Sequence, residues 1–159
     1  MGSLRPIILA AMILISHQAC AQSQFNMLRG VSKIKILIED MNGADYKKCG
    51  LTQEGVRAAI MYPLSSSKIQ IVDTAPYVTL YVNIGTLDNG VCSSSIQIDV
   101  NNFQPVKLEF SGDTKFAKVM LWYTGGVASG NRTSHSRLVS EFIEERIKKF
   151  VTDWNLDNR

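Results

Sequence analysis

Histidine and cysteine are scarce in this chain of 159 residues, which contains two of the first and three of the second. One of each lies in an N-terminal segment that we expect to be removed, so only Cys49, Cys92 and His135 remain. A structural zinc site takes about four such ligands. The sequence therefore predicts no metal and no cofactor, and it leaves His135 as the sole histidine that could act as a general base.

Charge of either sign is also limited. The chain has 17 basic and 14 acidic residues, for a net charge of +3, and it has neither a basic stripe nor a block of like charges. Binding to nucleic acid or to an anionic membrane surface normally depends on such a patch. We expect neither kind of partner.

Long apolar runs are lacking as well. The longest, Pro6–Ile15, has about ten residues, whereas a membrane-spanning helix needs roughly 20. It follows Arg5 and precedes small residues that end at Ala21, which is the pattern of a secretory signal peptide. We expect cleavage of residues 1–21 and one domain over residues 22–159, located in the periplasm or secreted.

The two remaining cysteines, Cys49 and Cys92, are expected to form a disulfide, because exported chains with two cysteines usually pair them. Two separate buried thiols are the alternative. Cys20 would carry lipid in a lipoprotein, but His17 and Gln18 before it do not fit the usual lipidation signal. We therefore expect no stable membrane anchor.

Alternation of apolar and polar residues predicts five strands. They cover residues 31–41, 68–73, 77–87, 91–110 and 116–123. The turn Asp88–Gly90 has strong hairpin chemistry. The fourth strand is expected to be bulged or broken between Asn101 and Pro105, because proline cannot donate a hydrogen bond to a central ladder.

Helical spacing of apolar residues predicts two helices. The first begins at a Thr52 cap and ends or kinks near Tyr62, because Pro63 clashes with the preceding turn. The second covers Leu138–Trp154 with a wide apolar stripe. The order β-α-β-β-β-β-α predicts an α+β fold, a two-layer sandwich of a mixed sheet with both helices on one face, and its first two strands are expected to be parallel.

Three segments resemble a group of uncharacterised exported bacterial proteins. They are CGLTQEGVRAAI at residues 49–60, PYVTLYVNIGTL at 76–87, and LWYTGGVASG at 121–130 with a following helix that ends FVTDWNLDN. The element order is also similar to small α/β domains of envelope assembly proteins, such as the amino-terminal domain of the Tol translocation protein and the curli secretion lipoprotein. The resemblance implies a fold and an envelope setting, and it supplies no active site.

The segment TGGVASGNRTSHSR, residues 124–137, is expected to be a glycine-rich loop between a strand and a helix. Gly125 and Gly130 have the spacing of a phosphate-binding loop, but Asn131 and Arg132 replace its lysine and hydroxyl residues. Nucleotide hydrolysis is therefore not expected. An anion held by the loop's N–H groups, among them that of Gly126, with help from Arg132 or Arg137, is an open alternative to a simple link and helix cap.

His135, within this segment, is expected to be an exposed residue at the start of the helix rather than a catalytic base. Ser134 and Ser136 are its sequence neighbours, and side chains one position apart do not face each other on a helix. The sequence therefore predicts no catalytic residue.

With both helices on one side, the other face of the sheet is expected to be uncovered. Five residues are candidates for binding there: Tyr77, Tyr81, Leu121, Trp122 and Tyr123. The face is expected to be built around Tyr77, Tyr81 and either Trp122 or Tyr123. We expect them to bind another protein or a second copy of the chain. Alternatively, the N-terminal arm, residues 22–30, folds over this face.

The leading functional hypothesis is therefore an exported, non-enzymatic interaction or envelope-assembly module. The alternative is a small-molecule or anion-binding protein that uses the glycine-rich segment. A hydrolase is least favoured, because the chain offers so few groups that could act as a base.

Overall fold

The computed structural model describes residues 26–74 and 77–159. Its centre is a mixed sheet of five strands in the order β2-β1-β3-β4-β5. The strands are β1 (Lys33–Ile38), β2 (Gln70–Ile71), β3 (Val78–Asp88), β4 (Cys92–Lys107) and β5 (Thr114–Gly130). β1 is parallel to β2 and β3, and the remaining pairs are antiparallel. The expected α+β fold and the parallel first pair of strands are confirmed.

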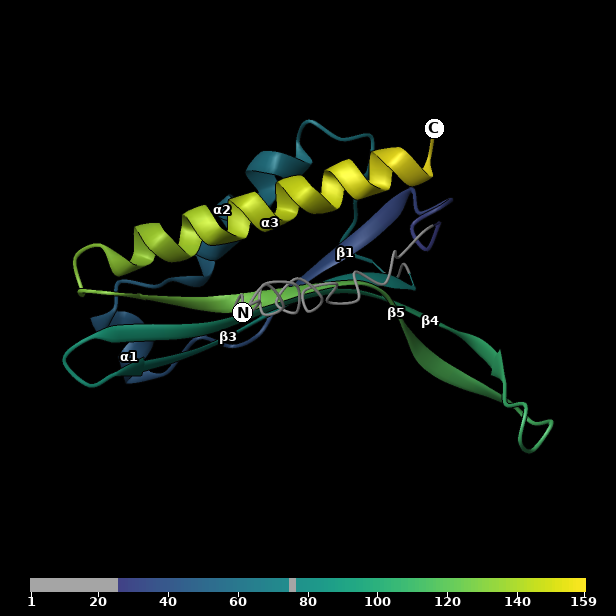
Figure 1. Cartoon of the computed structure of the whole chain (residues 1–159), viewed down its shortest axis with the longest axis horizontal. Coiled ribbons are helices and arrows are strands. Elements are labelled where there is room, and N and C mark those ends of the chain that lie inside the picture. The colour runs from purple at the N-terminus through teal and green to yellow at the C-terminus, as the bar shows by residue number, and fades with distance from the viewer. Residues whose placement is uncertain (1–25, 75–76) are drawn as a thin grey trace, which may run out of the picture.

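Two helices cover one face of this sheet, as Figure 1 shows. They are α2 (Gln53–Leu64) and α3 (His135–Asp157), while the short α1 (Ala44–Lys48) was not foreseen and lies against β3. The Thr52 hydroxyl accepts a hydrogen bond from the Gly55 N–H and caps α2, as expected. α2 ends at Leu64, close to the expected end near Tyr62, and Pro63 lies within its last turn.

The core lies between the sheet and these two helices. Strand residues such as Ile36, Val82 and Ile98 face Ile60 of α2 and Ile143 of α3, and all five are buried. The alternation expected from the sequence thus places aliphatic side chains on the helix side. The opposite sheet face has no helix lying across it in the described part of the chain (Figure 1).

β4 and β5 extend past the first residue of β3 as a two-stranded projection. β3 begins at Val78 opposite Asn102, and beyond that point β4 and β5 pair only with each other. We call residues 103–118 the hairpin arm, and Figure 1 shows it leading away from the helices. Pro105 lies in this arm, where β4 has a strand on one side only, so its missing N–H breaks no central ladder.

Of the bulge or break that was expected between Asn101 and Pro105, the structure has the bulge, which lies at Val100/Asn101. β4 stays paired with β5 throughout. Val100 pairs with Trp122 and Asn101 pairs with Met120, so Leu121 is the extra residue. A bulge shifts the alternation of the strand that carries it, and this shift decides which side of the sheet the residues of β5 face.

The N-terminal segment lies against the C-terminal end of α3. The Asp157 carboxylate accepts hydrogen bonds from the backbone N–H groups of Asn26 and Leu28, at 3.1 and 3.0 Å. The Trp154 indole N–H donates to the Val31 carbonyl at 2.6 Å. The described part of the expected N-terminal arm, Asn26–Gly30, is therefore on the helix side and does not cover the uncovered sheet face.

The expected signal peptide and its cleavage site lie outside the described residues. Within residues 26–74 and 77–159, no helix is long and apolar enough to cross a membrane.

Candidate functional site

The uncovered sheet face carries a group of large apolar side chains. Strand alternation places Tyr81 on this face, since Leu80 and Val82 point into the core. We call the group the aromatic face. Its members are Leu37, Tyr77, Tyr81, Phe103, Phe116, Met120 and Tyr123.

Most of these side chains are accessible to a partner. Tyr77 is 68% exposed and Phe116 is 63% exposed. Their rings contact edge to face with 6.3 Å between centroids, an arrangement that joins the start of β3 to the arm. The aromatic face therefore continues from the body of the sheet onto the hairpin arm.

A polar group lies beneath the aromatic side chains. The Asp99 side chain is only 1% exposed, and Lys118 Nζ lies 3.5 Å from its Oδ2. The same Nζ is 5.6 Å from the centre of the Tyr81 ring. Burial and the hydrogen-bonded Glu39 carboxylate raise the pKa of Tyr81.

The structure brings three of the five expected face residues together and separates the other two. Tyr77, Tyr81 and Tyr123 belong to the aromatic face, whereas Leu121 and Trp122 are buried on the helix side at 8% and 2% exposure. The expectation for Leu121 and Trp122 was wrong, because the bulge turns both of them toward the helix side.

Trp122 is held by α3. Its ring contacts Phe150 edge to face at 5.3 Å, and its indole N–H donates to Asp153 Oδ2 at 2.8 Å. It is one of the largest buried side chains in the core. Its role is to attach β5 to the helix.

Sequence reasoning missed Phe103, Phe116, Met120 and Leu37 as members of the aromatic face. If β5 alternated without a bulge, Phe116 and Met120 would face the same side of the sheet as Trp122. Because of the bulge, they face the opposite side, together with Tyr123. The disturbance near Asn101 was visible in the sequence, but a strand pattern does not say which partner strand carries the extra residue.

The glycine-rich segment is not a loop, contrary to expectation. Thr124–Gly130 belongs to β5, where Gly126 pairs with Ile96 and Gly130 pairs with Cys92. Successive N–H groups of a strand point in opposite directions, so they do not converge on one anion. The expected anion site at Gly125, Gly126 and Gly130 is therefore wrong.

The glycines instead let α3 lie close to the sheet. A Cβ placed on Gly126 would come within 2.7 Å of the Phe142 ring, and one on Gly130 would come equally close to Leu138. Both contacts are shorter than van der Waals packing permits. The lack of side chains at these positions thus sets the spacing of helix and strand.

Arg132 forms a structural ion pair rather than an anion site. Its Nε and Nη2 donate to Oδ2 of Asp88 at 3.1 and 2.7 Å. The Arg132 hydrogen bonds hold the pKa of the Asp88 carboxyl below its usual range. The pair connects the β3–β4 turn to the segment that precedes α3.

The expected disulfide between Cys49 and Cys92 is confirmed, with Cα atoms 5.8 Å apart. The Asp88 carboxylate lies within 4.8 Å of the two sulfur atoms. Both sulfurs are bonded to each other and Asp88 is bound by Arg132, so these three groups are engaged in structural contacts.

His135 is fully buried, which corrects its expected exposure. Its Nε2 lies 2.8 Å from the Ser94 hydroxyl, which in turn is 2.8 Å from the Thr86 hydroxyl. A serine and a histidine at this distance have the geometry of a nucleophile and its base. Both side chains are fully buried, and this burial lowers the pKa of His135.

Comparison with known proteins gives little. No protein-family model and no curated protein sequence matches the chain. The crystal structure of a minor lipoprotein from Acinetobacter baumannii is similar over 78% of this chain and 90% of its own, with 9% identity and a TM-score of 0.39. A likeness of this strength does not indicate a shared function.

Proposed function

We propose that the protein is an exported, non-enzymatic interaction module that binds a protein partner, or a second copy of itself, through the aromatic face. The observation that carries the proposal is the exposure of Tyr77, Phe116 and their neighbours on a sheet face that no described helix covers. Soluble monomers rarely expose contiguous apolar patches of this kind without a use for them.

The composition of the face fits a protein interface. Aromatic residues and methionine are enriched at such interfaces, and charged residues are depleted from their centres. Near its centre the charge of Lys118 is paired with Asp99, while Lys35 and Glu39 lie toward β1 on the same face. A partner would meet large rigid rings that lose little conformational entropy on binding, with charged groups beside them.

The disulfide supports the export of the module. Disulfides persist in oxidising compartments and are rare where thiols are kept reduced. The N-terminal sequence adds the features of a secretory signal, so we place the mature protein in the periplasm or outside the cell. An envelope-assembly role is the kind of task that suits an exported module of this size.

Binding rather than catalysis is the better-supported activity. His135 is enclosed with Ser94 beneath α3. A general base must come within hydrogen-bond reach of a bound substrate.

Site-specific photo-crosslinking tests this proposal. A benzophenone amino acid at position 116 should give an adduct of defined mass, whereas the same group at position 127 should not. Val127 is a matched control because it is 71% exposed on the same sheet face but lies eleven residues further along β5. Adducts formed by the purified protein identify a second copy, and adducts formed only in cells identify another partner.

The double substitution Tyr77→Ser with Met120→Ser should abolish the position-116 adduct while circular dichroism shows an unchanged fold. An adduct that survives this substitution, or equal adducts from positions 116 and 127, would overturn the proposal.

A further inference from the structure

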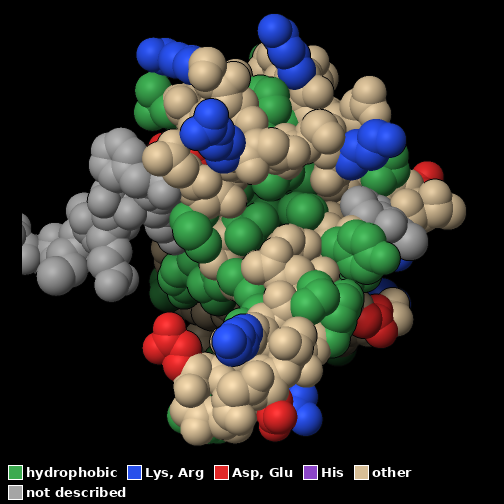
Figure 2. Space-filling model, turned by 90° about the vertical axis from the view of Figure 1, so that its right-hand side faces the viewer, with side chains coloured by type: hydrophobic (Ala, Val, Ile, Leu, Met, Phe, Trp, Pro, Cys, Tyr) green, Lys and Arg blue, Asp and Glu red, His purple; other side chains and the backbone are tan. Residues whose placement is uncertain are grey.

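A cavity of about 500 Å³ lies on the helix side of the sheet, opposite the aromatic face. It is bounded by the N-terminal segment, by the start of β3 and by the base of the hairpin arm. Figure 2, which views the molecule from the end that carries the arm, shows hydrophobic side chains gathered at the centre of this end. Its size falls within the range of about 300–1,000 Å³ that is usual for small-molecule sites.

The bulge and the start of β3 together create this space. The arm leads away from α3 beyond Asn102, so no helix fills the region above its base. The extra residue of the bulge, Leu121, contributes its side chain to the floor. The cavity is therefore a consequence of the backbone path and not of a missing side chain.

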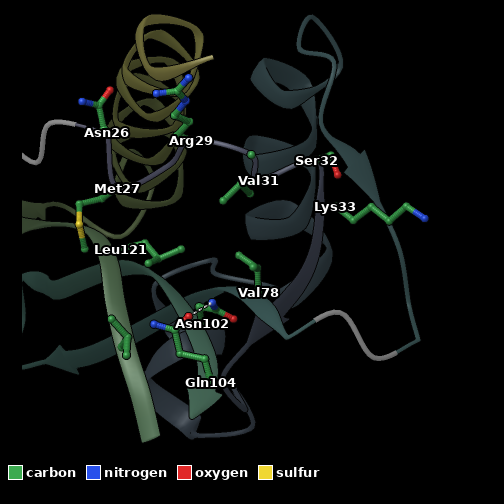
Figure 3. Close-up of a pocket in the computed structure, with 12 residues that line it drawn as sticks. Asn26, Met27, Arg29, Val31, Ser32, Lys33, Val78, Asn102, Gln104 and Leu121 are labelled. Atoms are coloured by element: carbon green, nitrogen blue, oxygen red, sulfur yellow. Dashed lines mark hydrogen bonds between the residues drawn. The ribbon is translucent and has the colours of Figure 1, made fainter. Parts of the chain in front are cut away.

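The inner walls are apolar. Figure 3 shows Val31, Val78 and Leu121 pointing toward one another, with Met27 beside them. Val119 completes this part of the lining. Met27 is 42% exposed, so apolar surface here is open to solvent and would be buried by a ligand.

Two amides supply hydrogen-bonding groups at one end. Asn102 Nδ2 donates to Gln104 Oε1 at 2.9 Å, which orients both side chains (Figure 3). This pairing leaves the Gln104 NH₂ group as a donor, since the hydrogen bonds found among the described residues do not use it. A donor beside apolar walls suits a ligand with a polar acceptor at one end.

The charge around the cavity has a single sign. Arg29 and Lys33 stand on its rim, and the other ten lining residues include no acid. In Figure 3 both side chains extend outward from the rim, and neither takes part in an ion pair within the described residues. Their long flexible stems allow them to reach a group at the mouth. The rim of the cavity therefore favours an anion.

We propose that this cavity binds an amphipathic anion, an unbranched aliphatic chain that ends in a carboxylate. The chain would lie against Val31, Val78 and Leu121, where it removes apolar surface from water. The carboxylate would lie at the rim and pair with Arg29 and Lys33. This binding activity is separate from the proposed use of the aromatic face. Either proposal can be disproved while the other stands.

Isothermal titration of the exported protein with decanoate, below its micelle-forming concentration, tests the proposal. Decanoate should bind saturably with one site per chain. Decyltrimethylammonium has the same tail with the opposite charge, and acetate has the head without a tail, so both should bind at least about tenfold more weakly. Equal binding of the cation, or no saturable binding of decanoate, would overturn the proposal.

Variants locate the site. The double substitution Arg29→Ser with Lys33→Ser should weaken decanoate binding about tenfold or more. Lys35→Ser is the matched control, because Lys35 lies on the same strand but does not line the cavity, and it should leave binding unchanged. An unchanged affinity in the double variant would overturn the proposal.

A wall substitution separates this cavity from the aromatic face. Val119→Asp places a carboxylate beside the bound tail and should abolish decanoate binding, and circular dichroism checks the fold of this half-buried position. The Tyr77→Ser, Met120→Ser variant should bind decanoate normally. Loss of binding in that variant instead would show that the tail adsorbs to the aromatic face, and the cavity proposal would be wrong.

Discussion

His135 shows how much a single residue depends on its surroundings. It begins α3, where its sequence neighbours are polar, and yet it is fully buried against Ser94 of β4. Its Nδ1 has no hydrogen-bond partner among the described residues. Protonation would place a positive charge in this enclosed space, where the Ser94 hydroxyl beside the ring and the Thr86 hydroxyl that contacts Ser94 are both neutral.

The stability of the protein should therefore fall in mild acid. Burial lowers the pKa of His135 in the folded state below its ordinary value of 6.5. Above pH 6.5 the His135 side chain is neutral in both the folded and the unfolded protein, so its contribution to the free energy of unfolding is fully present. As pH falls below 6.5 the unfolded chain takes up the proton first, so the free energy of unfolding should decrease by up to about 1.4 kcal/mol per pH unit until the folded-state pKa is reached.

Urea unfolding between pH 7.5 and 5.0 measures this slope. His135→Gln keeps a hydrogen-bonding group near Ser94 but does not titrate, so its stability should be nearly independent of pH over this interval. The same slope in the variant and the original chain would show that other groups are responsible.

At the scale of elements, the contact of β5 with α3 explains the glycine-rich segment. Gly126 lies directly beneath Phe142, and Trp122 is fixed between the strand and Phe150. Glycine weakens a strand on its own, because it has more conformational freedom to lose. Its presence here is accounted for by the close approach of the helix.

Gly126→Ala should destabilise the protein by about 1 kcal/mol, the lower end of the usual cost of overpacking, because the half-buried Phe142 ring can partly turn aside. Gly85→Ala is the control, since a Cβ on Gly85 meets nothing within 4 Å. Denaturant midpoints of both variants measure the difference. An equal or smaller effect at position 126 than at position 85 would contradict this explanation.

At the scale of the whole molecule, two connections join segments that are far apart in sequence, one near each end of α3. The disulfide joins Cys49 after α1 to Cys92 at the start of β4, opposite Gly130 and close to the start of α3. At the other end of α3, Asp157 and Trp154 bind the N-terminal segment. Segments far apart in sequence are thereby fixed on both sides of the core.

Removing the disulfide should have a large effect. Cys49→Ala with Cys92→Ala should lower the free energy of unfolding by about 4 kcal/mol, because the crosslink restricts a loop of roughly 44 residues in the unfolded chain. Thermal unfolding of the double variant, beside the unmodified protein with and without a reductant, measures this loss. Equal stability of all three would show that the core alone holds the fold.

The fold class was predictable because it depends on local patterns. The alternation at 77–87 placed Leu80, Val82 and Ile84 on the core side, and the stripe of α3 identified Ile143 and Phe150. The hairpin at Asp88–Gly90 and the cap at Thr52 follow from short-range chemistry. Each of these features is decided by residues close together in sequence.

The site was predictable only in part, because a bulge is a property of two strands. Tyr77, Tyr81 and Tyr123 were placed on the correct face, while Leu121 and Trp122 were not. The strand pairing that moves Trp122 into the core joins Val100 to a residue 22 positions later in the chain. The register of this pairing cannot be read from the residues of either strand alone.

The sequence by itself determined the mixed sheet, the two covering helices and the pair of cysteines, since periodicity, turn residues and composition act over short distances. The tertiary structure decided that the glycines form a strand beneath α3, that His135 is enclosed, and that the aromatic face and the cavity lie on opposite sides of the arm. These outcomes depend on which surfaces meet, and such contacts are set by the packing of the whole chain.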